Sequence, residues 1–147
     1  MRRAEAMAVG AAALLGGGVA YQFALALGAP LGEATLGGRA DHADGVLEPT
    51  FRVIAAVSGL LLLLSAAIVL RRVRLVPLPL LGDRAVRWAT WNIAVLLAFN
   101  TVGNLAAPHP LERWGMGALT LGAGLLAAGV ARWADETPAT PGGTAGA

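Results

Sequence analysis

Residues 53–70, VIAAVSGLLLLLSAAIVL, decide the fold class of this chain. The stretch holds no charged residue and is followed directly by an arginine-rich segment that begins at Arg71. An α-helix rises about 1.5 Å per residue, and about 20 apolar residues cross the 30 Å of hydrocarbon in a bilayer. These 18 residues therefore predict a membrane-spanning helix that leaves the lipid at the arginines.

The composition of the whole chain is typical of a membrane protein. The 147 residues are 56% hydrophobic and only 14% charged, whereas a soluble domain is about 25% charged. A net charge of +2 indicates no nucleic-acid partner. The absence of cysteine excludes disulfides, thiolate catalysis and cysteine metal sites. The lipid bilayer is the partner that the composition implies.

Three more apolar segments predict three further spans, at about residues 7–27, 88–107 and 114–131. The first follows a basic start, as in a signal peptide, but it exceeds the apolar core of about 7–15 residues that signal peptides carry. We therefore expect it to be retained. The prediction is an all-α, polytopic membrane protein. Its one domain, residues 1–133, forms a four-transmembrane-helix bundle, and a disordered cytoplasmic tail follows at 134–147.

Helix-breaking and capping residues mark the ends of these spans. Proline lacks an N–H group, which the first turn of a helix does not need, so we expect Pro49 and Pro110 to begin the second and fourth helices. Asp83 is expected to cap the third helix. Residues 31–48 are polar and rich in glycine, and we expect them to form an exposed loop.

The arginines predict the orientation. With four spans, eight of the 11 basic residues fall on one side of the membrane. Arginine-rich loops stay in the cytoplasm, so the prediction is a multi-pass protein of the cell membrane (inner or plasma membrane) with both termini cytoplasmic. The cytoplasmic set is Arg2, Arg3, Arg71, Arg72, Arg74, Arg84, Arg87 and Arg132, and the outer set is Arg39, Arg52 and Arg113.

Glycines recur every seven residues in the first and fourth spans. Helices in lipid associate by close packing rather than by hydrophobic burial, and a seven-residue spacing keeps small residues on one seam. We expect the first and fourth helices to pack along seams formed by Gly10 and Gly17, and by Gly115, Gly122 and Gly129. Chance spacing among the 20 glycines of the chain is the alternative.

Polar side chains gather near the outward ends of the predicted spans. Such groups are costly in lipid and indicate either function or hydrogen bonds between helices. Each has a structural alternative. The two asparagines can form hydrogen bonds between helices, and the glutamate suits the first turn of a helix. The two arginines can reach the lipid headgroups or pair with glutamates, and the histidine can be an ordinary loop residue. The candidate outward-facing polar pocket comprises Gln22, Arg52, Asn100, Asn104, His109, Glu112 and Arg113.

Motifs for catalysis or cofactor binding are absent from the sequence. The chain has no phosphate-binding loop, no dinucleotide fingerprint and no HExxH. No two histidines stand four residues apart, which argues against a haem or zinc site within the bundle. We therefore predict no catalytic, cofactor-binding or metal residue. No carboxylate lies in the middle of a span, which argues against ion-coupled transport by this chain alone.

Short motifs resemble a known group of proteins. Residues 21–32, YQFALALGAPLG, are similar to the end of the first span in a small uncharacterised four-helix integral membrane protein family of actinobacteria. Asn100, Asn104 and residues 110–114, PLERW, are similar to its third and fourth spans. The resemblance covers about residues 7–133. It implies the four-span topology and adds no activity.

Three functions are compatible with these features. A structural or accessory membrane component, alone, as a homo-oligomer or with another membrane protein, is favoured because it needs only the helix seams. The first alternative is a subunit of a transporter or channel. The second is a membrane enzyme or ligand-binding protein in which Arg52 holds an anion and His109 or Glu112 moves protons. Catalysis is the less expected outcome.

The predicted orientation can be tested at the end of the chain. A reporter enzyme that is active only outside the cytoplasm, fused after Ala147, should be inactive, because an even number of spans returns the chain to its starting side. The same reporter inserted in the 31–48 loop should be active. Activity of the terminal fusion would contradict the topology.

Overall fold

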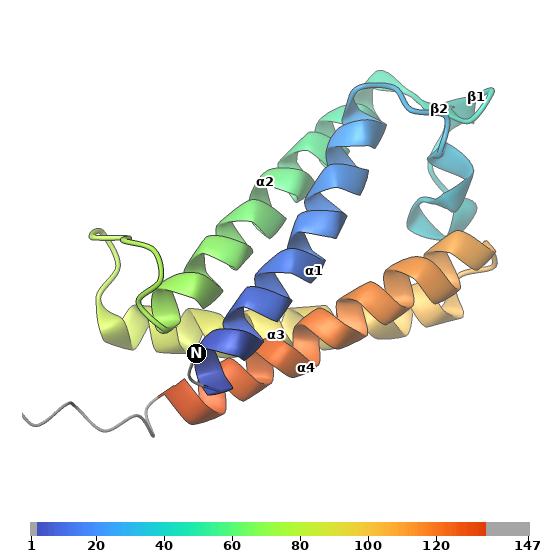
Figure 1. Ribbon diagram of the computed structural model, residues 1–147. Coiled ribbons are helices and arrows are strands. Elements are labelled where there is room, and N and C mark those ends of the chain that lie inside the picture. Colours follow the sequence, from blue (N-terminus) through green and yellow to red (C-terminus); the bar gives the residue numbers. More distant parts are fainter. Residues whose placement is uncertain (1–2, 135–147) are drawn as a thin grey trace, which may run out of the picture.

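The computed structural model describes residues 3–134, and this part of the chain is all-α, as predicted (Figure 1). The predicted tail at 134–147 lies outside the described residues from 135 onward. A π-helical turn, Leu111–Met116, leads directly into the last helix. The four long helices are α1 (Arg3–Ala26), α2 (Pro49–Arg72), α3 (Asp83–Ala106) and α4 (Gly117–Trp133).

Three helical segments of the described chain are long and apolar enough to cross a membrane: Arg3–Ala26, Pro49–Arg72 and the continuous Leu111–Trp133. By length and composition they make this chain a membrane protein. The helix α3 is outside this set, although its 24 residues match the others in length. Three asparagines dilute its apolar residues.

Local sequence signals explain most helix ends. The helix α2 begins at Pro49, as predicted. The N-terminal capping position of α3 is occupied by Gly82, not by the predicted Asp83. The side chain of Asp83 makes no capping hydrogen bond. The Asp83 carboxylate instead lies 3.0 Å from the guanidinium of Arg71 and 3.6 Å from that of Arg74. The Asp83 carboxylate therefore pairs with two arginines and not with the free N–H groups at the start of the helix. The exposed contact contributes at most about 1 kcal/mol.

The segment between α1 and α2, predicted to be an exposed loop, contains short regular elements and a few buried side chains. It contains two 3₁₀ turns, Gly32–Ala34 and Leu36–Gly38, and two paired strands, β1 (His42–Ala43) and β2 (Val46–Leu47). Asp44 and Gly45 join the strands with positive φ angles, as a tight hairpin requires. Its apolar side chains Ala34, Ala40 and Leu47 are buried. We call residues 31–48 the cap.

The helices form two hairpins that meet at one end. The helix α1 packs along α2, α3 packs along α4, and α1 also packs on α4, whereas α2 and α3 touch far less. Figure 1 shows that the two hairpins diverge from the arginine-rich end. The cap bridges the opening between them at the opposite end, which we call the cap end. The main core fills the arginine-rich half, where Leu15, Val69, Val86 and Val130 are fully buried.

Glycines of α1 and α4 face large side chains of the opposite helix. A Cβ atom built on Gly122 would lie 3.0 Å from Leu14 Cδ1, which leaves no room for a larger residue. Gly115 differs, because its nearest neighbour is Leu111 of its own segment. The contacts run antiparallel along both helices and pair Gly10 with Leu126, Gly17 with Leu119, Gly122 with Leu14, and Gly129 with Met7.

A leucine at Gly122 should destabilise the protein. It would force α1 away from α4, and overpacking of this kind costs about 1–3 kcal/mol. The matched control is Gly16→Leu on α1, because a Cβ at Gly16 meets nothing within 4 Å. The thermal midpoint in mild detergent should fall clearly for Gly122→Leu and little for Gly16→Leu. Equal midpoints would show that the seam carries no stability.

Candidate functional site

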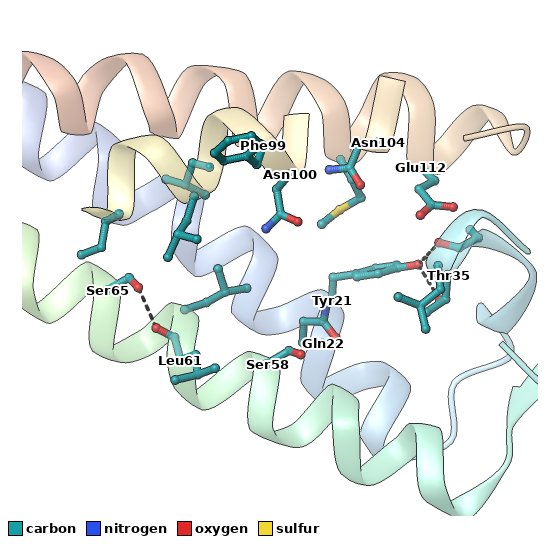
Figure 2. A pocket seen from close by; sticks show the side chains of 17 residues that line it. Tyr21, Gln22, Thr35, Ser58, Leu61, Ser65, Phe99, Asn100, Asn104 and Glu112 are labelled. Carbon is teal, nitrogen blue, oxygen red and sulfur yellow. Dashed lines mark hydrogen bonds between the residues drawn. The ribbon is translucent and has the colours of Figure 1, made fainter. Parts of the chain in front are cut away.

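A cavity of about 540 Å³ lies between the two hairpins, beneath the cap (Figure 2). Pockets for small molecules have typical volumes of about 300–1,000 Å³. All four long helices or their leading turns contribute to its wall, together with the cap. The polar side chains that line it are Tyr21, Gln22, Thr35, Ser58, Ser65, Asn100, Asn104 and Glu112.

The cavity opens sideways, between α2 and α3. Three of its lining residues are large hydrophobic side chains that are also strongly exposed: Leu61 at 59%, Leu96 at 63% and Phe99 at 71%. They belong to α2 and α3, which touch far less than the two helices within each hairpin. Toward the arginine-rich end, the main core closes the space between the helices. The cavity is therefore blind at that end and open on the face that α2 and α3 share.

Two contacts pin the cap to the two hairpins. The Tyr21 hydroxyl of α1 donates a hydrogen bond to the carbonyl oxygen of Ala34 at 2.7 Å. The backbone N–H of Gly37 donates to both carboxylate oxygens of Glu112, at 2.9 Å each. Gly37 has a φ of +67°, which suits glycine. The buried Glu112 thus fixes the cap to the start of the fourth helical segment.

Two amide side chains of the wall have no hydrogen-bond partner within residues 3–134. Gln22 on α1 and Asn100 on α3 both line the cavity, and Figure 2 shows Asn100 directed into it. The hydroxyls of Ser58 and Ser65 are already used, since each donates to the carbonyl four residues earlier in α2. The unpaired amides are thus available to a bound molecule or to water.

Asn104 is hydrogen-bonded to another helix, unlike Asn100, although both lie on α3. Its Nδ2 donates to Thr120 Oγ1 of α4 at 3.3 Å, and Thr101 Oγ1 lies 3.0 Å from the same oxygen. This group joins α3 to α4, and hydrogen bonds between helices in lipid contribute about 0.6–2 kcal/mol. The sequence left both interpretations open for the two asparagines. The structure places one in a helix–helix contact and the other unpaired in the cavity.

Four of the seven predicted pocket residues line the cavity, and three do not. Arg52 Nε donates to the carbonyl of Ala26 at 2.8 Å, and Arg113 Nε donates to that of Ala107 at 2.9 Å. Each arginine therefore satisfies an orphan carbonyl at the end of the preceding helix. His109 Nδ1 accepts a hydrogen bond from the backbone N–H of Leu111, in the turn between α3 and α4. These three side chains are outside the lining of this cavity.

Sequence reasoning missed the two serines and the threonine of the wall. Ser58 and Ser65 stand seven residues apart, which places them on one face of α2 and is a signal that the sequence does contain. Thr35 gave no such signal, because its position depends on how the cap folds.

The wall of the cavity favours hydrogen bonding over metal or acid–base chemistry. Among the described residues, no group of three or more His, Cys, Asp and Glu side chains could hold a metal ion. The one carboxylate in the lining is Glu112, whose oxygens both accept from Gly37. What the cavity offers is amide and hydroxyl groups beside apolar surface.

Comparison of the chain with protein-family models, with curated proteins and with solved structures finds no match. The resemblance to the actinobacterial membrane proteins therefore stays a prediction.

Loss of the Glu112 carboxylate should release the cap. A hydrogen bond to a charged group contributes about 1.5–3 kcal/mol, so Glu112→Ala should raise local opening of the cap about tenfold or more. Trypsin cleavage after the exposed Arg39, followed by mass spectrometry of the fragments, measures this opening. Glu48→Ala is the control, because Glu48 is exposed and makes no capping hydrogen bond. Equal cleavage rates in the two variants would contradict the role of Glu112 in holding the cap.

Proposed function

We propose that this chain crosses the cell membrane four times and keeps both termini in the cytoplasm. The length of α3 equals that of α1 and α2, and α3 packs along α4, an apolar helix. The exposed Trp88 and Trp91 near the start of α3 suit an interface between membrane and water. In this orientation the arginine-rich end is cytoplasmic, and the cap lies outside.

Within this membrane protein, we propose that the cavity binds an amphipathic molecule that enters from the lipid between α2 and α3. The observation that carries the proposal is the pair of unpaired amides, Gln22 and Asn100, in a blind cavity with an apolar opening. A polar group left without a partner in an apolar environment costs about 1–3 kcal/mol. A molecule with a polar head and an apolar body offsets that cost and fills the opening.

Binding fits the geometry better than conduction or catalysis. A conduit needs a path through both halves of the membrane, but within the described residues the core around Leu15, Val69 and Val130 closes the cytoplasmic half. Acid–base catalysis by His109 or Glu112 also lacks support. His109 lies outside the cavity, and Glu112 holds the cap.

A structural or accessory role in a larger assembly is the second candidate. It is favoured by α3, which is less apolar than the other helices and exposes Phe99, Asn100 and Val102. A helix from another copy or from another membrane protein could cover this face. In that case the amides would be paired by protein rather than by a small molecule.

Native mass spectrometry of protein extracted in mild detergent separates the two candidates. We expect a monomer that carries one small molecule. Asn100→Leu should lose that molecule, whereas Asn92→Leu on the same helix should keep it, because Asn92 is outside the cavity wall and donates to the carbonyl of Trp88. An oligomer without added mass would favour the assembly role. Equal retention by both variants would contradict binding at the amides.

A further inference from the structure

We propose that the cavity selects a lipid with an uncharged head that carries both hydroxyl and carbonyl oxygens, such as a diacylglycerol, over a lipid with a phosphate head. This inference rests on the proposed binding function and adds the chemical class of the molecule.

The charge of the wall excludes a phosphate. Anions in water-poor sites are held by arginine or lysine, but no basic residue of the described chain lines the cavity. Of the three arginines at the cap end, Arg52 and Arg113 are bound to helix-end carbonyls, and Arg39 is exposed and outside the lining. The charged group that does line the cavity is the Glu112 carboxylate. A phosphate brought beside it would lose its hydration and meet a like charge, and both effects oppose binding.

The hydrogen-bonding groups of the wall match an uncharged head. Each unpaired amide, that of Gln22 or of Asn100, offers two N–H donors and one oxygen acceptor. The hydroxyls of Ser58 and Ser65 have already donated to α2, so they can only accept. The wall therefore donates to carbonyl oxygens and accepts from hydroxyl groups. A head that carries one hydroxyl beside two ester carbonyls satisfies both kinds of group.

The shape of the site suits a head attached to acyl chains. The polar groups share the wall with the exposed Leu61, Leu96 and Phe99, which flank the opening on α2 and α3. A head can occupy the cavity while its chains leave past these side chains into the lipid. Entry from the side also needs no movement of the cap, which is fixed at Ala34 and Gly37.

Cysteine protection tests the head-group preference, because the chain has no cysteine of its own. Ser65→Cys places a thiol in the cavity wall, and Leu64→Cys places one next to it on the exposed face of α2, outside the wall. Each variant is reconstituted in phosphatidylcholine nanodiscs and labelled with a lipid-soluble maleimide. The two probes are dioctanoylglycerol and dioctanoyl phosphatidic acid at equal mole fraction, which share their chains and differ by the phosphate.

Dioctanoylglycerol should slow labelling of the Ser65→Cys variant several-fold, phosphatidic acid should have little effect on it, and neither probe should change labelling of the Leu64→Cys variant. Adding Asn100→Leu should remove the protection. Adding Glu112→Gln should narrow the difference between the two probes, because the repelling charge is gone. Equal protection by both probes would overturn the head-group preference and leave binding in place. No protection by either would overturn both proposals.

Discussion

The close contact of α1 with α4 holds the two helical hairpins together, and the cavity depends on where that contact ends. Lipid chains are as apolar as leucine, so helices gain little from burying apolar surface and associate by packing closely. Gly10 and Gly122 each receive a leucine of the opposite helix. Beyond this seam α1 carries the larger Tyr21 and Gln22, and the hairpins separate. The same contact that joins the hairpins therefore sets the depth of the space between them.

The width of that space is held by polar contacts at the cap end. In both hairpins an arginine three residues after a proline, Arg52 or Arg113, donates to a carbonyl at the end of the preceding helix. The cap is then tied to one hairpin through Tyr21 and to the other through Glu112. These bonds lie beyond the end of the α1–α4 seam, and they keep the hairpins at a defined separation.

The chemistry of the wall follows from this frame. An amide in an apolar span normally finds a partner across a helix contact, as Asn104 does with Thr120. Asn100, one turn away on α3, lines the cavity between the hairpins, and no side chain or backbone group of residues 3–134 hydrogen-bonds to its side-chain amide. The cavity thus combines unpaired amides with an opening of exposed leucine and phenylalanine, which is the pattern that an amphipathic molecule complements.

The sequence alone determined the features that depend on neighbouring residues. Apolar length made the membrane helices recognisable, Pro49 marked a helix start, and the seven-residue glycine spacing indicated which helices approach. The tertiary structure decided which way each polar side chain faces. Arg52 and Asn100 looked equally suited to a pocket, yet one meets the carbonyl of Ala26 and the other an open cavity. The folded cap and the sideways opening were equally hidden, because they arise from contacts between residues far apart in the chain, and local spacing does not record which distant group a side chain will meet.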